Sequence, residues 1–136
     1  MKVFIPLIVL VCMLTTSQSL LSNNPLVSKE TSNLLTQLVR TSQDYDLYNA
    51  RCRGNAASTK TEDSNRLFLA KYRLTGNQVI ALYIGKDDRA ERAAMKQAFL
   101  QQIGLLGGCA GAKKMNFLKK LDQKYRQLFE QISNLP

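Results

Sequence analysis

The stretch Ile103-Gly-Leu-Leu-Gly-Gly-Cys-Ala-Gly-Ala-Lys-Lys114 decides how the chain is arranged, because it separates the two segments with the most regular helical periodicity. It holds four of the seven glycines. Each interior glycine costs a helix about 1 kcal/mol relative to alanine, so several together favour a corner between two helices. The alternative is one continuous helix in which Gly104, Gly108 and Ala112 form a stripe of small residues that a neighbouring helix approaches closely.

The same glycines do not form a phosphate-binding loop. Such a loop has the pattern G-x-x-x-x-G-K followed by Ser or Thr. Here Ala112 follows Gly111, and Met115 follows Lys113-Lys114. The stretch is therefore predicted to be a structural corner and not a nucleotide site.

Residues 1–19 have the order of regions that is typical of a secretory signal peptide. Met1-Lys2 is a short positive start, Val3 to Leu14 is almost wholly apolar, and Ser17-Gln18-Ser19 fits the small-residue cleavage rule. The apolar run of about 12 residues is shorter than the roughly 20 that a membrane-spanning helix needs. We expect cleavage near Ser19 and export of residues 20–136, as a single helical domain, to a bacterial periplasm or the cell exterior. An uncleaved membrane anchor is the alternative.

Loss of this leader removes Cys12 and leaves Cys52 and Cys109, which allow a single intramolecular pairing. In an oxidising compartment we expect a Cys52–Cys109 disulfide, which stabilises by about 4 kcal/mol on the loop-entropy model. Two free thiols or an intermolecular bridge are the alternatives. Two cysteines without any histidine argue against a zinc site, and we expect no metal and no cofactor.

Apolar residues at three- and four-residue steps predict a first helix over about 29–51. Ser28 is its expected N-cap and Gly54 lies just beyond its end, which places Cys52 at the end of this helix. A second helix is expected to begin at Thr61, Glu62 and Asp63 and to stop near Thr75-Gly76.

Residues 66–85 allow two interpretations. Thr75 with Gln78 is a capping-box pattern, which indicates the end of one helix and the start of another. The alternation of Phe68, Tyr72 and Leu74 with other residues also fits a strand, in a hairpin that turns at 75–77. We favour the two helices.

Asp88 with Glu91 is a second capping-box pattern, and the helix that it opens is predicted to run to Ile103 or Leu106. After the corner, one apolar stripe predicts the last helix. Its members are Leu118, Leu121, Tyr125, Leu128, Ile132 and Leu135. The predicted fold class is all-α: a small, mostly antiparallel bundle of four or five helices, stapled by the Cys52–Cys109 disulfide.

The composition argues against catalysis. Without histidine there is no Ser-His or Cys-His apparatus and no histidine-bound metal. Asp44 and Asp46 are predicted to lie on opposite sides of a helix, and capping explains Asp87 and Asp88. We expect a protein that is not an enzyme. A hydrolase with two converging carboxylates is the enzymatic alternative.

The formal net charge of +9 predicts attraction to acidic surfaces. The candidate binding residues are Lys113, Lys114, Lys120 and Lys124, with a plain solvated face as the alternative. Nearby tyrosines either anchor an interface or belong to the core, the commoner role; they are Tyr45, Tyr48, Tyr72 and Tyr83.

We therefore expect an exported, non-enzymatic binding protein of inhibitor, immunity or secretion-accessory type, which engages another protein through a basic, tyrosine-bearing face. The alternative is a secreted effector or a protein that binds anionic membrane surfaces through its last amphipathic helix. No nucleic-acid partner is expected, because no recognition motif is present. The outline is similar to that of small bacterial periplasmic accessory proteins such as immunity proteins, secretion pilotins and acid chaperones, in architecture alone.

Overall fold

The computed structural model describes residues 27–136, and this part of the chain is helical without strands. The signal peptide predicted over 1–19, its cleavage site near Ser19 and residues 20–26 lie outside the described residues. No helix between residues 27 and 136 is both long and apolar enough to cross a membrane. The helices are α1 (Lys29–Arg53), α2 (Thr59–Tyr72), α3 (Gly76–Tyr83), α4 (Asp88–Leu105), α5 (Gly108–Lys114) and α6 (Phe117–Asn134).

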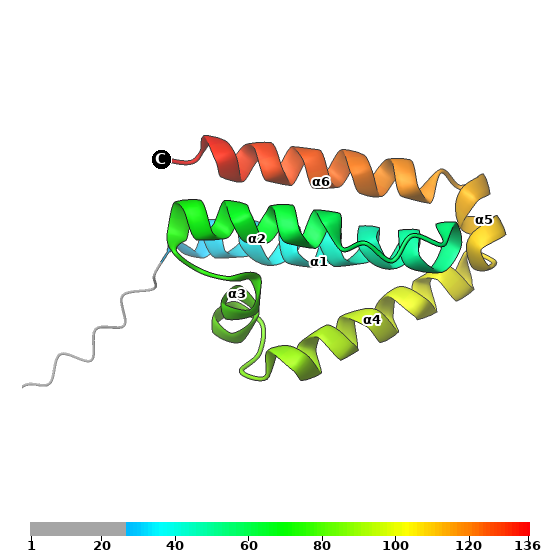
Figure 1. The fold of residues 1–136 in the computed structure, drawn as a ribbon, viewed down its shortest axis with the longest axis horizontal. Coiled ribbons are helices and arrows are strands. Elements are labelled where there is room, and N and C mark those ends of the chain that lie inside the picture. Colours follow the sequence, from blue (N-terminus) through cyan, green and yellow to red (C-terminus); the bar gives the residue numbers. More distant parts are fainter. Residues whose placement is uncertain (1–26) are drawn as a thin grey trace, which may run out of the picture.

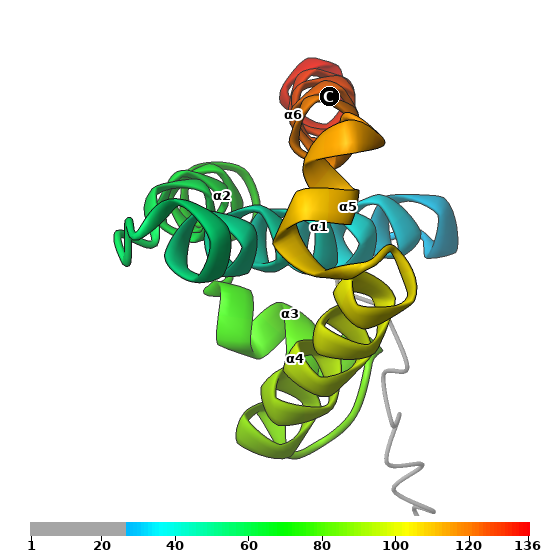
Figure 2. The same cartoon turned by 90° about the vertical axis from the view of Figure 1, so that its right-hand side faces the viewer.

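Helix α1 is the central element of the bundle and contacts α2, α3, α4 and α6. Figure 1 shows α2 and α6 running along α1, while α4 slants away from α6 on the other side. Seen end-on in Figure 2, α1 lies between α6 above, α2 at one side, and α3 with α4 below. The predicted all-α bundle with its disulfide is confirmed, and α5 is a short helix additional to those expected.

The capping residues explain where the first helices begin and end. The Thr31 amide donates to Ser28 Oγ at 3.1 Å, and α1 ends at Gly54, whose φ of 66° suits a residue without a Cβ. Thr75 and Gln78 form the full capping box, with bonds of 2.8 and 3.1 Å, so residues 66–85 form two helices and no hairpin. At α4 the N-cap is Asp87 and not Asp88.

The start of helix α2 is capped by a carboxylate from α1. Its own N-cap, Ser58, makes no side-chain capping bond. Instead, Asp46 accepts hydrogen bonds from the amides of Lys60 at 3.1 Å and Thr61 at 2.8 Å. These are two of the donors that a helix start leaves unpaired, and a carboxylate there also interacts favourably with the helix dipole. This long-range cap fixes the antiparallel return of α2 against α1.

The buried side chains form two clusters along α1. The larger lies among α1, α2, α3, α4 and α6 and includes Leu38, Phe68 and Ile132, each with 0 % exposure. The smaller contains Tyr48, Phe99, Ile103, Ala112 and Phe117, and it lies beside the disulfide, where α4, α5 and α6 meet the end of α1. The second cluster positions the site described below.

The stretch 103–114 is a corner, and the continuous-helix interpretation of it is wrong. Helix α4 ends at Leu105, and Gly107 and Gly108 follow with φ values of 91° and 75°. Residues with a Cβ avoid this left-handed region, so two consecutive glycines allow the abrupt turn into α5. Gly111 then packs so closely on the Leu106 carbonyl that a Cβ would overlap it.

Arg92 ties α4 to two other helices. Its Nε and Nη2 donate to Asn77 Oδ1 on α3 at 2.9 and 2.7 Å, and its Nη1 donates to Gln43 Oε1 on α1 at 3.1 Å. The Gln43 side chain donates in return to the Arg92 carbonyl at 3.0 Å. Partial burial lowers the pKa of Arg92, although the guanidinium remains a cation throughout the physiological range. The network holds the first half of α4 against the bundle.

Candidate functional site

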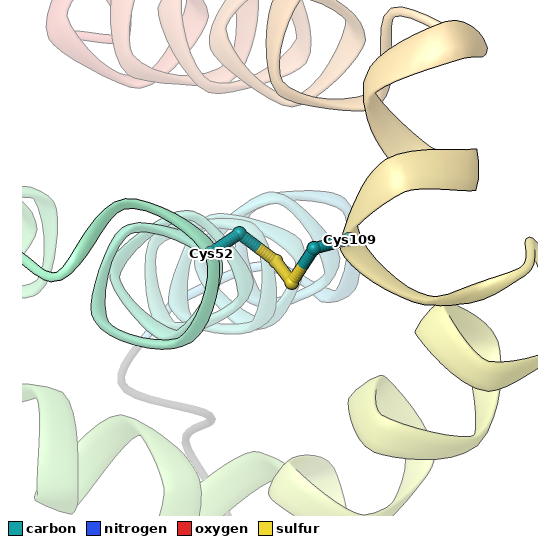
Figure 3. Close-up of a disulfide and its surroundings, with 2 residues drawn as sticks. All are labelled: Cys52 and Cys109. Atoms are coloured by element: carbon teal, nitrogen blue, oxygen red, sulfur yellow. A yellow bond between two sulfur atoms is a disulfide. The ribbon is translucent and has the colours of Figure 1, made fainter.

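The disulfide joins the end of α1 to the start of α5. Cys52 and Cys109 have their Cα atoms 5.5 Å apart and are separated by 57 residues in the sequence. Figure 3 shows the bond crossing from the last turn of α1 to α5. Helix α5 has only seven residues. The disulfide and the glycine corner that precedes α5 hold this short helix in place.

A pocket of about 520 Å³ lies beside this bond. Its apolar part comes from Tyr48, Phe117, Leu118 and Ala110, together with the two cysteines. Its polar part consists of Asn116 and three cations, which are Arg53, Lys113 and Lys119. The pocket therefore combines an apolar surface with a positive rim, at the junction of α1, α5 and α6.

The floor of the pocket is a fixed aromatic group. The rings of Tyr48 and Phe117 are 5.8 Å apart and tilted by 36°, and Phe99 lies 6.4 Å from Phe117. Tyr48 and Phe117 are 5 % and 8 % exposed, so both are held by the second core cluster. Aromatic pairs at such distances and tilts stabilise each other beyond the area they bury.

The pocket shares three of its lining cations with a wider positive surface, which we call the basic end. It is formed by six exposed cations where α1 ends, α5 lies and α6 begins; they are Arg51, Arg53, Lys113, Lys114, Lys119 and Lys120. The sequence has no Asp or Glu over residues 47–61 or over residues 92–121. The parts of α1, α5 and α6 that lie in these two segments therefore carry cations without interspersed carboxylates.

The cations of the basic end have no carboxylate partner within residues 27–136. The two ion pairs in this part of the chain are Arg66–Asp63 and Arg126–Asp122, neither of which includes a cation of the basic end. Arg53 donates to the amide oxygen of Asn49 at 3.1 Å, which orients the guanidinium without neutralising it. An external anion could therefore interact with these charges without first displacing an internal partner.

The four lysines predicted as binding residues do not share one depression. Lys113 lines the pocket beside the disulfide, and Lys114 is exposed on the same short helix. Lys120 and Lys124 line a separate groove of about 480 Å³ between α4 and α6, with α1 as its floor. The prediction missed Arg53 and Lys119, which the pocket brings next to Lys113. The acid-free segments around them were the signal in the sequence.

The groove between α4 and α6 contains Asp44. Burial raises the pKa of this carboxyl from 3.8 to about 6, even though Lys124 and Arg40 lower it. Desolvation therefore outweighs the two neighbouring cations. Asp44 has no ion pair within 4.0 Å among the described residues, whose ion pairs lie elsewhere.

We predict that Asp44→Asn stabilises the protein at neutral pH. Since the folded-state pKa lies above the unfolded one, the native state loses stability as the pH rises from about 4 to about 6. Asparagine keeps the shape and removes the charge. Discounted for solvent screening at this half-buried site, the gain is about 1 kcal/mol at pH 7.5.

Thermal unfolding measured by circular dichroism from pH 3.5 to 7.5 tests this prediction. The melting temperatures of the variant and the wild type should coincide at pH 3.5 and separate between pH 4 and 6. Glu130→Gln, at an exposed carboxylate, is the matched control and should shift neither end of the profile. A constant gap at every pH would show that the charge of Asp44 is not the cause.

The tyrosines pack into the bundle. Tyr48 is buried, and Tyr72 and Tyr83 have buried hydroxyls with no hydrogen-bond partner among the described residues. Burial raises the pKa of both of these phenols. Tyr45 is half-buried and lies 5.3 Å from Lys60 Nζ, as part of a cation–π contact. Packing is therefore the role that the structure supports for these rings.

The carboxylates do not converge on a shared position. Asp46 is engaged by the start of α2, whereas Asp44 lies in the groove between α4 and α6. Within residues 27–136 no three Cys, Asp or Glu side chains come close enough together to hold a metal ion. The basic end is therefore the feature with the clearest binding chemistry.

No protein-family model, curated protein or solved structure matches this chain.

Proposed function

We propose that the protein is a non-enzymatic binding protein whose basic end engages an acidic protein partner. The observation that supports this most is the set of six exposed cations on two sequence segments, 47–61 and 92–121, that contain no carboxylate. Complementary charge accelerates encounter and selects against basic surfaces. The expected contact surface consists of the cations and the pocket between them, and Tyr48 in the pocket lining is the one tyrosine that belongs to it.

The proposal includes export, as the sequence pattern predicts. The Cys52–Cys109 bond supports it, because structural disulfides are common in exported proteins and rare in a reducing cytosol. In that setting the bond would persist and keep α5 in its position at the basic end. An inhibitor, an immunity protein or a secretion accessory is the kind of binding protein that fits this setting.

A second candidate partner is an anionic membrane surface. Leu105, at the end of α4, is 89 % exposed, and Met115, between α5 and α6, is 52 % exposed. Both belong to the end of the bundle that carries the cations (Figure 1). Cations that attract anionic lipid, with apolar side chains that enter the interface, are the features of peripheral membrane proteins.

Binding to poly-L-glutamate, measured by isothermal titration calorimetry, tests the proposed function. We expect salt-sensitive binding that weakens about five- to tenfold in the double variant Lys113→Gln/Lys119→Gln, since each charge contributes a fraction of a kcal/mol to about 1 kcal/mol. The matched control is Lys86→Gln/Lys96→Gln, which removes the same charge from exposed positions away from the basic end.

Equal weakening by the two double variants would mean that net charge alone is responsible, and the proposed role of the basic end would be wrong. Co-sedimentation with phosphatidylglycerol vesicles separates the two candidate partners. Vesicle binding that Leu105→Gln and Met115→Gln abolish would favour the membrane surface. Absence of vesicle binding at low salt would remove it.

A further inference from the structure

We infer that the pocket beside the disulfide receives an apolar side chain of the acidic partner, so that the recognised segment carries an aromatic or large aliphatic residue among carboxylates. This inference rests on the proposed function and adds the chemistry of the recognised segment. It concerns the pocket of about 520 Å³ and not the cations of the basic end that lie outside it.

The pocket has an apolar surface that a purely acidic ligand would leave unused. Tyr48 and Phe117 form its floor, and Leu118 and the disulfide complete its apolar lining. Its volume exceeds that of a single side chain, and a buried aromatic or aliphatic anchor contributes much of the binding energy in protein interfaces. A phenylalanine ring could also contact the tilted Tyr48–Phe117 pair.

The cations at the rim of the pocket favour an apolar side chain that has carboxylates next to it in the bound segment. Arg53, Lys113 and Lys119 line it, and no acidic residue is among the lining residues. An uncharged ligand would desolvate these cations without compensation, which is unfavourable. Carboxylates on either side of the apolar anchor would pair with them instead.

The shape favours a side chain of another protein over an enclosed small molecule. Ala110, Lys113 and Lys119 are exposed, so the pocket opens to solvent along its rim. The disulfide holds α5 in place, and the core holds both aromatic rings, so the pocket is formed before binding. A preformed pocket loses little conformational freedom when a partner docks.

Two synthetic peptides test the inference by isothermal titration calorimetry on the whole oxidised protein. One is acidic with a single central phenylalanine, and the other has glycine in its place. We expect the phenylalanine peptide to bind about tenfold more tightly, as is typical of one well-placed anchor. Ala110→Phe fills the pocket without changing any charge and should abolish this difference between the two peptides. Ala93→Phe, at an exposed alanine of α4, is the matched control and should preserve it.

The outcomes separate this inference from the function on which it rests. If both peptides bind equally and with salt sensitivity, the pocket has no anchoring role and the basic end retains its proposed one. If the preference for phenylalanine survives in Ala110→Phe, the anchor lies elsewhere and the inference is wrong. If neither peptide binds at low salt, both proposals fail.

Discussion

Replacement of Cys52 and Cys109 by alanine is expected to lower the free energy of unfolding by about 4 kcal/mol and the melting temperature by about 15–25 °C. The physical reason is the unfolded state, because the bond closes a loop between residues 57 apart and restricts the chain before it folds. Differential scanning calorimetry of the wild type and the double variant measures the effect. The stabilisation is large beside the 5–15 kcal/mol that is typical of a whole domain.

Reduction of the wild type supplies the control for this prediction. Wild-type protein whose two thiols have been shown by mass spectrometry to be free should melt near the temperature of the double variant. The variant itself should not respond to reductant. An unchanged melting temperature of the reduced wild type would contradict the expected role of the bond.

The second large effect is expected at Gly111. A Cβ at this position would overlap the backbone carbonyl of Leu106, so Gly111→Ala must push α5 away from the end of α4. The strain from such overpacking is about 3 kcal/mol. Since Ala112 and Cys109 lie on the same short helix, the shift should also disturb the second core cluster. Urea unfolding gives the loss of stability directly.

Gly104→Ala is the matched control for that experiment. Gly104 lies inside α4, is exposed, and has no atom within 4 Å of the position that a Cβ would take. Alanine there should stabilise the protein by about 1 kcal/mol, because glycine is the poorer helix former. Two glycine-to-alanine changes seven residues apart are thus expected to have opposite signs. Destabilisation by both would contradict the described corner.

The corner was predictable from a local rule, and the disulfide from the number of cysteines. Consecutive glycines are expected where a helix must stop abruptly, and Gly107 with Gly108 takes the left-handed φ values that this requires. Two cysteines allow one intramolecular pair. The capping box at Thr75 correctly identified residues 66–85 as two helices. Its hydrogen bonds join Thr75 to Gln78, so the signal lies within four consecutive residues.

The features that were missed depend on contacts between distant residues. The start of α2 is set by Asp46, fourteen and fifteen residues from the amides that it caps, so the sequence near Thr61 contained only part of the signal. The tie between Arg92 and Gln43 spans 49 residues. Helical periodicity identifies the buried face of a helix but not the neighbour that it contacts.

In the candidate site, too, some features could be predicted from the sequence and others depend on contacts between distant residues. The lysine-rich run predicted a basic surface, and Lys113 does line the pocket. Whether Lys120 lies in the same pocket as Lys113 depends on the direction that α6 takes after α5. Between these two helices Asn116 takes a left-handed φ of 54°, which helical periodicity does not predict. Arg53 lies far from Lys113 in the sequence, and the disulfide between the neighbouring Cys52 and Cys109 brings the two cations to one pocket.

The long loop closed by the disulfide affects what happens to the protein after proteolytic cleavage. Exposed basic residues next to irregular backbone, such as Arg53 before the loop into α2 and Lys86 before α4, are the positions that trypsin-like enzymes attack first. Both cleavage points lie between Cys52 and Cys109, so the two fragments of a nicked molecule would remain covalently joined. A single cut there would leave a two-chain protein whose helices stay paired, and separation of the fragments would require reduction as well as denaturation.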